Sequence, residues 1–106
     1  EKILRNIYTI TIDKESRDFD TYANRISNFI IDDQKTIIFT DMFGGTPSNI
    51  SLSFFKKDLV EIISGVNLPM LIKASTLEKY ESFEEAVKII SNSGKDNIIV
   101  AGDLNI

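Results

Sequence analysis

A short apolar segment followed by a pair of glycines is the feature that most constrains the fold of this chain. Residues 36–40 (Thr-Ile-Ile-Phe-Thr) form a nearly continuous apolar run, which is typical of a strand covered on both faces in a parallel sheet. Gly44 and Gly45 then interrupt the run, and Thr46-Pro47 has the pattern of a helix N-cap followed by proline in the first turn. The sequence therefore predicts a strand-turn-helix unit around the two glycines.

The rest of the chain repeats this alternation of strands and helices. Strands are indicated by β-branched or apolar runs, and helices by apolar residues that recur every three or four positions. The predicted strands are residues 7–12, 36–40, 59–66 and 97–100. The predicted helices cover residues 19–30, 46–55, 68–74 and 83–94, with N-caps at Ser16 or Asp18, Thr46, Asn67 and Ser82. This order predicts the α/β class: one domain over residues 1–106, with a three-layer, mainly parallel open sheet and helices on both faces.

The residue content argues against several functions. The 106 residues have a formal net charge of -4 and no basic stripe, which disfavours a nucleic-acid partner. They contain no cysteine, so disulfide and thiolate chemistry are excluded. Apolar runs are much shorter than the roughly 20 residues that span a membrane, so we expect a cytoplasmic protein. The scattered Asp and Glu residues fit solvated turns and helix starts, and we expect neither a metal nor a cofactor.

Histidine is also absent from the 106 residues. It is the most frequent general base and metal ligand, and a common phosphoryl carrier. Serines and carboxylates are present, but without histidine they make no triad, which leaves an unrelated hydrolase the weakest hypothesis.

Residues 41–49 lie where open parallel sheets bind ligands, beyond the carboxyl end of a strand. Gly44 and Gly45 allow close approach of the backbone to a ligand. We expect the amides of Gly45, Thr46, Ser48 and Asn49 to face a phosphate-sized anion at the start of the helix, with added hydrogen bonds from the hydroxyls of Thr46 and Ser48. An ordinary strand-to-helix turn uses the same residue types, and the segment matches neither a P-loop nor a dinucleotide fingerprint.

Two further groups of residues belong to this candidate site. Asp41 places a carboxylate at the tip of a buried strand, where it can orient an imidazole or join an acidic site; the alternative is local capping of the loop. The loop at residues 65–70 follows the next strand and is predicted to form another wall of the same crevice. The predicted wall residues are Phe43, Asn67 and Pro69.

Residues 40–49 (Thr-Asp-Met-Phe-Gly-Gly-Thr-Pro-Ser-Asn) and 64–71 (Ser-Gly-Val-Asn-Leu-Pro-Met-Leu) resemble the enzyme IIA domain of the mannose/fructose/sorbose family of the sugar phosphotransferase system (PTS). The resemblance implies a phosphoryl carrier that accepts phosphate from HPr on a histidine and passes it to an enzyme IIB domain during sugar import. Contact with the membrane is then indirect, through the IIC and IID components. The implied assembly is a homodimer that exchanges its C-terminal strand, here residues 97–106. The implied roles are orientation of the histidine by Asp41 and receipt of the phosphoryl group by the turn at Gly45 and Thr46.

The family's active histidine lies in a strand-helix unit that precedes the matching segment. We expect about one such unit, roughly 30 residues, to be missing before Glu1. Truncation of a complete domain is the favoured explanation, because a sheet without an inner strand exposes two hydrogen-bonding edges. Loss of the histidine during evolution is the other.

Other functions stay open at the level of sequence. The resemblance also fits an enzyme IIA-like regulatory domain of a PTS-controlled transcription activator, or the related phosphocarrier that serves dihydroxyacetone kinase. The absence of histidine fits a catalytically inert dimerisation or anion-binding domain.

Overall fold

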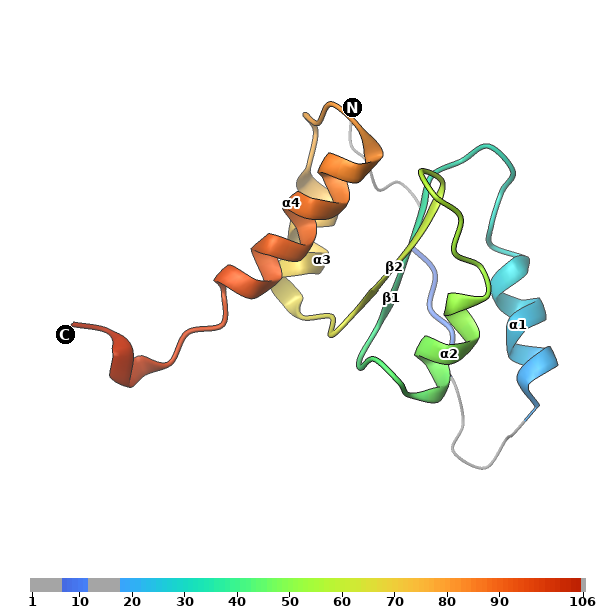
Figure 1. The fold of residues 1–106 in the computed structure, drawn as a ribbon, viewed down its shortest axis with the longest axis horizontal. Coiled ribbons are helices and arrows are strands. Elements are labelled where there is room, and N and C mark those ends of the chain that lie inside the picture. Colours follow the sequence, from blue (N-terminus) through green and yellow to red (C-terminus); the bar gives the residue numbers. More distant parts are fainter. Residues whose placement is uncertain (1–6, 12–17, 106) are drawn as a thin grey trace. The chain divides into compact units, whose positions relative to one another are not determined.

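The structure, a computed structural model, describes residues 7–11 and 18–105 (Figure 1). The chain divides into two compact units, Arg5–Val66 and a second made mainly of Asn67–Ile106. Each unit is described on its own, and the single domain predicted for residues 1–106 stays a prediction.

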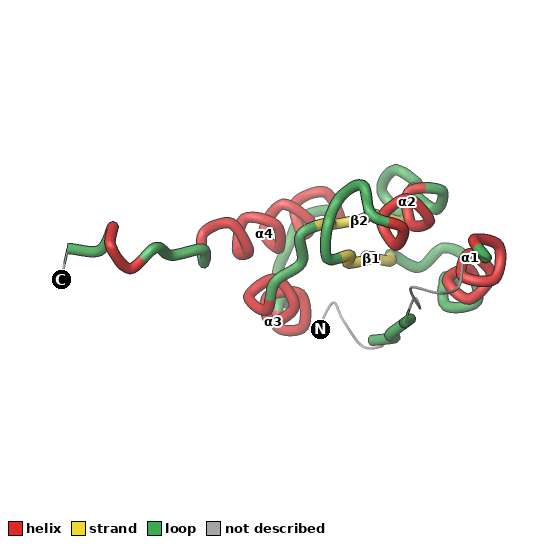
Figure 2. The backbone as a smooth tube through the Cα atoms, turned by 90° about the horizontal axis from the view of Figure 1, so that it is seen from below, coloured by secondary structure: helices red, strands yellow, loops and turns green. Residues whose placement is uncertain are grey.

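The first unit is built on a two-stranded parallel sheet. Its elements are α1 (Phe19–Ser27), β1 (Thr36–Thr40), α2 (Thr46–Leu52) and β2 (Val60–Ser64). The strands pair in register, from Thr36 opposite Val60 to Thr40 opposite Ser64. Helix α2 contacts both strands, and α1 packs beside α2 (Figures 1 and 2). A parallel sheet combined with helices confirms the predicted α/β class.

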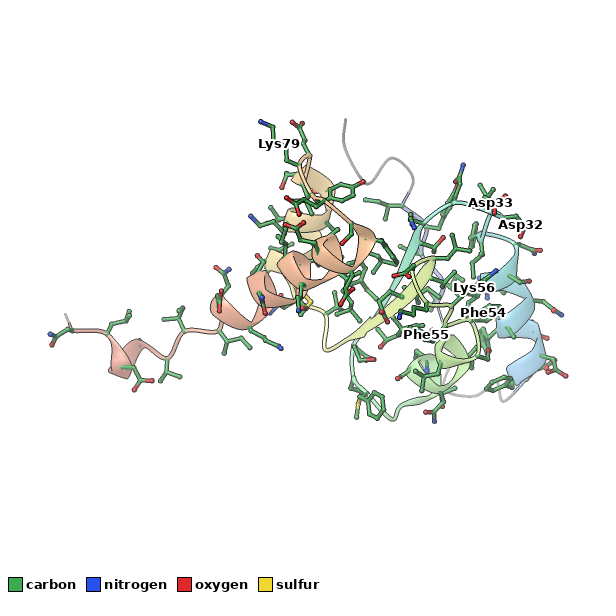
Figure 3. The ribbon with its side chains drawn as sticks, turned by 45° about the horizontal axis from the view of Figure 1, so that its top comes forward. Asp32, Asp33, Phe54, Phe55, Lys56 and Lys79 are labelled. Carbon is green, nitrogen blue, oxygen red and sulfur yellow. The ribbon has the colours of Figure 1, made fainter. Side chains whose placement is uncertain are left out.

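The core of this unit lies where α1 meets α2. Tyr22 and Ile26 of α1 and Ile50 of α2 are buried together. Partly buried apolar side chains surround them: Ile10, Ala23, Ile30, Ile38 and Phe54, the last labelled in Figure 3. Burial of one large aliphatic or aromatic side chain contributes about 1.5–3 kcal/mol. This cluster therefore supplies much of the energy that holds α1, α2 and β1 together.

The second unit is a pair of packed helices, α3 (Leu68–Thr76) and α4 (Phe83–Asp96), followed by a 3-10 turn, η1 (Ala101–Asp103). The N-caps are those predicted from sequence. Asn67 Oδ1 accepts the Met70 amide at 3.3 Å, and Ser82 Oγ accepts the Glu85 amide at 3.1 Å. Both caps satisfy amides that a helix start leaves without an intrahelical partner.

Two predicted strands are wrong within the described residues. Residues 7–11 form no strand, and residue 12 of that prediction lies outside the described part of the chain. Instead, Tyr8 stacks on Phe29, with ring centroids 4.3 Å apart. Residues 97–100 are also irregular, and Ile98, Ile99 and Val100 are 71%, 62% and 61% exposed. Both segments have strand-forming residues, but a strand also needs a neighbour to complete its hydrogen bonds. In the described residues the sheet consists of β1 and β2, and neither segment lies beside them as a third strand.

The first strand of the sheet is also less covered than predicted. Four of the five β1 residues are partly exposed, and Thr40 alone is buried. This follows from a sheet that has two strands in the described residues.

All four helices end away from the predicted positions; α1 ends at Ser27 rather than residue 30, and α3 ends at Thr76 rather than residue 74. Helix α2 ends at Leu52 rather than near residue 55, because the backbone amide and hydroxyl of Ser53 both donate to the Ile50 carbonyl, at 3.3 and 2.7 Å. Lys56 accordingly lies beyond the helix, where its backbone pairs with Val60. Helix α4 continues through Gly94 to Asp96. Gly94 serves close packing there, since a Cβ at that position would lie 2.6 Å from Cγ of Met70.

Candidate functional site

The predicted turn leaves the carboxyl end of β1 and leads into α2. Asp41, Met42, Phe43 and Gly44 are all exposed, and the exposed fraction of Phe43 reaches 73%. The Asp41 carboxylate accepts the Met42 amide through Oδ1 at 2.9 Å. Asp41 thus caps its own loop, as the alternative interpretation predicted, and keeps its side chain at the surface.

The two glycines of the turn have different backbone conformations. Gly44 has φ +86°, in the left-handed region that L-residues with a Cβ rarely adopt. Gly45 is extended, with φ -78° and ψ 170°, and is the N-cap of α2. The predicted N-cap at Thr46 is therefore off by one position. Thr46 is the first residue of the helix, and α2 begins without a side-chain cap.

Asn49 is already engaged within α2. Its amide donates to the Gly45 carbonyl at 2.9 Å, and its Nδ2 donates to the Gly44 carbonyl at 3.4 Å. The expectation that the Asn49 amide faces an anion is therefore wrong, because this amide makes an early intrahelical hydrogen bond. The amides of Gly45, Thr46 and Ser48 remain the predicted donors.

The hydroxyl groups of Thr40 and Ser48, on either side of the turn, both lie close to the hydroxyl group of Ser64. Thr40 Oγ1 lies 2.8 Å from Ser64 Oγ, and Ser48 Oγ lies 3.3 Å from the same Ser64 oxygen. Thr40 is 5% exposed, Ser48 is fully buried and Ser64 is partly buried. The Ser48 hydroxyl, predicted to contact the ligand, thus forms part of this hydroxyl cluster (Thr40, Ser48, Ser64).

Sequence reasoning did not single out Thr40 or Ser64. A partial signal for their pairing exists, because Thr40 ends one predicted strand, Ser64 lies near the end of the next, and parallel strands end at the same edge of a sheet. The contact with Ser48 has no such signal, since it depends on how α2 packs.

The second predicted loop begins against the end of β1. The amides of Gly65 and Val66 both donate to the Thr40 carbonyl, each at 3.0 Å. Gly65 also has a positive φ, +84°. These contacts all lie within the first unit and fix where the chain leaves β2.

Asn67 and Pro69, the predicted wall residues of this loop, belong to the second unit. The Asn67 amide group donates to the Gly94 carbonyl at 3.0 Å, so its side chain links the start of α3 to α4. Pro69 is the second residue of α3 and is partly buried. Their predicted place beside Phe43 stays a prediction.

Two kinds of site were sought among residues 7–11 and 18–105. No group of three or more His, Cys, Asp or Glu residues there is arranged to hold a metal ion. The same residues include no helix with the length and apolar character needed to cross a membrane.

Comparisons with known proteins agree with this geometry. A family model described as the PTS system fructose IIA component (EIIA-man) matches residues 3–91. A PTS system fructose-specific EIIA component from Bacillus subtilis (strain 168) is 25% identical over 75 residues, which are 70% of this chain and 51% of that protein. The chain therefore spans about half the length of this curated relative.

A solved structure shares the fold. The crystal structure of phosphotransferase system component EIIA from Streptococcus agalactiae matches with a TM-score of 0.74 at 22% identity, covering 85% of this chain and 72% of that one. The resemblance inferred from residues 40–49 and 64–71 is confirmed by the family match, which includes both segments and most of the chain. This chain belongs to the EIIA-man family of PTS fructose IIA components.

Proposed function

We propose that this chain is the phosphoryl-carrier domain of a sugar phosphotransferase system, which receives phosphate from HPr and passes it to an enzyme IIB domain during sugar import. The observation that carries the proposal is the turn at Asp41–Thr46 in a chain of this family. It presents an exposed carboxylate, a left-handed glycine and a helix start within six residues. We treat residues 1–106 as one domain, because the family match runs across the boundary between the two units.

Asp41 is the proposed orienting group. A carboxylate that accepts an imidazole N–H fixes the tautomer of that ring and turns its other nitrogen toward the phosphoryl donor. Oδ1 of Asp41 already accepts the Met42 amide, which restrains the carboxylate in position. Because the 106 residues contain no histidine, the proposal places the phosphoryl-accepting histidine outside them.

The turn after Asp41 is the proposed receiver of the phosphoryl group. Backbone amides at a helix start favour an anion. Gly44, through its positive φ, directs the chain into the extended Gly45, and the proposed donors are the amides of Gly45, Thr46 and Ser48. Ser48 would act through its amide, since its hydroxyl belongs to the hydroxyl cluster. The exposed Thr46 hydroxyl is the proposed side-chain donor.

Partner contacts follow from the same proposal. Phe43, Asn67 and Pro69 are proposed to line the site where HPr and IIB dock, and the 73% exposure of Phe43 supports a contact role. The exposed apolar residues 98–100 support a homodimer formed through residues 97–106. The proposed location is the cytoplasm, with membrane contact only through the IIC and IID components.

The test is phosphorylation of the protein expressed from its complete gene, using HPr and its upstream enzyme. We expect Asp41→Asn to slow phosphoryl transfer about 10- to 100-fold, a common effect of losing a group that orients a functional histidine. Asp33→Asn is the matched control. Asp33, labelled in Figure 3, precedes β1, whereas Asp41 follows it. The positive φ of Asp33, 65°, is one that asparagine accepts.

Three outcomes would contradict parts of the proposal. Failure of the complete protein to accept phosphate would remove the carrier function. Phosphorylation of the 106-residue chain itself would remove the histidine mechanism. Acceptance of phosphate from HPr without transfer to any IIB domain would favour the regulatory domain of a transcription activator instead.

A further inference from the structure

Ser64 joins the two ends of the candidate turn. Thr40 immediately precedes Asp41, and Ser48 lies in the first turn of α2, just beyond Gly45. The Ser64 hydroxyl reaches both, at 2.8 Å from Thr40 Oγ1 and 3.3 Å from Ser48 Oγ. One side chain at the end of β2 therefore contacts the residues that flank the turn on either side.

Backbone contacts reinforce the same junction. Thr40 and Ser64 are paired in the register of the sheet, and the Thr40 carbonyl accepts the amides of Gly65 and Val66. The end of β1 is thus held to the end of β2 by main chain and side chain together. The first turn of α2 is tied to this junction through the Ser48–Ser64 contact.

The polarity of this junction points to a geometric role. Apolar side chains of similar size would fill the space, but apolar packing is non-directional. Hydrogen bonds constrain both distance and angle, so a hydroxyl cluster fixes how far apart the three backbone segments lie. The cluster is satisfied, since no buried side-chain nitrogen or oxygen among the described residues lacks a partner. The hydrogen bonds of the hydroxyl cluster therefore connect protein groups on either side of the turn.

We propose that Ser64 is a positioning residue for the phosphoryl site: its hydroxyl holds Thr40 and Ser48 at a fixed separation and so sets where the Asp41 carboxylate stands relative to the first amides of α2. This inference rests on the function proposed above for the turn. Ser64 acts through Thr40 and Ser48.

The test is a titration of the protein expressed from its complete gene with inorganic phosphate, followed by backbone amide NMR at Met42, Gly44, Gly45 and Thr46. We expect Ser64→Ala to weaken phosphate binding about three- to tenfold, the effect of losing one hydrogen bond of ordinary strength. Ser64→Thr keeps the hydroxyl on a strand-favouring residue and is expected to restore binding to within about twofold. Ser53→Ala is the matched control, because the Ser53 hydroxyl bonds only locally, to the Ile50 carbonyl.

A second measurement separates positioning from stability. In phosphate-free solution, Ser64→Ala is expected to shift the Met42 and Gly44 amide signals, and Ser53→Ala is expected to leave them in place. A purely structural role for Ser64 would lower the melting temperature while both the amide signals and the phosphate affinity stayed unchanged, and that result would overturn the inference.

The two proposals can fail separately. If the unsubstituted chain does not bind phosphate, the proposed receiving turn is contradicted, and the amide signals alone then decide the role of Ser64. If the unsubstituted chain binds phosphate and Ser64→Ala binds it equally well, the positioning role is contradicted and the proposed function stands.

Discussion

At the scale of single residues, Gly44 and Gly45 make different demands on side-chain size and backbone conformation. A Cβ added at Gly44 would meet open space, but φ there is +86°, whereas Gly45 is extended and its Cβ would make an ordinary 3.4 Å contact with Met42. We expect Gly44→Ala to lower the free energy of unfolding by about 1–2 kcal/mol, the cost of a left-handed conformation for an L-residue. Gly45→Ala should cost less, about 0.5–1 kcal/mol, because Gly45 is the N-cap of α2 and alanine is a poorer N-cap than glycine. Urea denaturation of the two variants measures both.

Gly44→Ala and Gly45→Ala serve as controls for each other. Equal losses at both positions would show that backbone conformation does not distinguish them. A larger loss at Gly45 would indicate that the Met42 contact, rather than φ, limits the turn.

The predictable part of the site is the part encoded by local sequence. The position of Asp41 at a strand end and the need for glycine at Gly44 follow from short-range rules on strands and turns. The partner of the buried Ser48 hydroxyl is Ser64, which is 16 residues away in the sequence. The use of the Asn49 amide depends on a one-residue shift of the N-cap to Gly45, which falls within the usual uncertainty of helix boundaries.

At the scale of elements, the N-cap of α1 makes the stability of this helix depend on pH. The Thr21 hydroxyl and amide both donate to Asp18, the N-cap, and these hydrogen bonds lower the pKa of its carboxyl below its ordinary value of 3.8. A lowered folded-state pKa means stability that is present above the unfolded pKa and is lost as pH falls through the folded one. We expect the α1 contribution to decline below about pH 4.

Asp18→Asn separates charge from capping, because asparagine caps helices equally well but does not titrate. Circular dichroism and thermal unfolding between pH 2 and 7 should show a shallower acid-induced loss in the variant than in the parent. Identical acid profiles for the two proteins would assign the loss to other carboxyl groups.

The packing of α3 against α4 depends on the missing side chain at Gly94. A Cβ there would meet Met70 Cγ at 2.6 Å, so Gly94→Ala forces the methionine to move. Overpacking costs about 1–3 kcal/mol and alanine's better helix propensity returns about 1 kcal/mol, which predicts a net loss of about 1 kcal/mol in unfolding free energy. Thermal or urea unfolding measures this loss.

A double-mutant cycle with Met70→Ala tests the stated cause. With the methionine shortened, Gly94→Ala should become neutral or stabilising. Gly102→Ala, in open space within η1, is the control and should be close to neutral. An undiminished loss in the Met70→Ala background would show that Met70 is not the obstacle.

The prediction of helices and strands succeeded where the sequence signal was local. It failed where a segment needed a neighbouring strand to pair with. The predicted caps Asn67 and Ser82 were correct, and Asp18 was one of two candidates for the first cap. The apolar run of β1 was also placed correctly. Each of these features depends on neighbours a few residues away. Residues 7–11 and 97–100 have the composition of strands but no strand beside them in the described structure. Composition shows that a segment is able to pair, and only tertiary structure supplies the pairing.

At the scale of the whole molecule, the exposed apolar residues 98–100 predict self-association under the homodimer proposal. Ile98→Lys introduces a charge at the most exposed of them, at 71%. We expect this change to weaken dimerisation about tenfold or more, from the lost burial of one large aliphatic side chain. Sedimentation over a range of protein concentrations measures the effect, with Asn92→Lys on an exposed position of α4 as the control. A parent chain that stays monomeric throughout would contradict the proposed interface.

The single-domain prediction makes the two units depend on each other for stability. Gly44→Ala acts in the first unit and Gly94→Ala in the second. In one cooperative domain, both changes lower the same melting temperature, by roughly 4–8 °C for each kcal/mol lost. Ile50 belongs to the first unit and Ile90 to the second, and both are fully buried, so their methyl NMR signals report the two halves separately and should disappear together in every variant. Independent units would instead give Gly44→Ala an effect on Ile50 alone and Gly94→Ala an effect on Ile90 alone. That pattern would show that residues 1–106 fold as two units, each stable without the other.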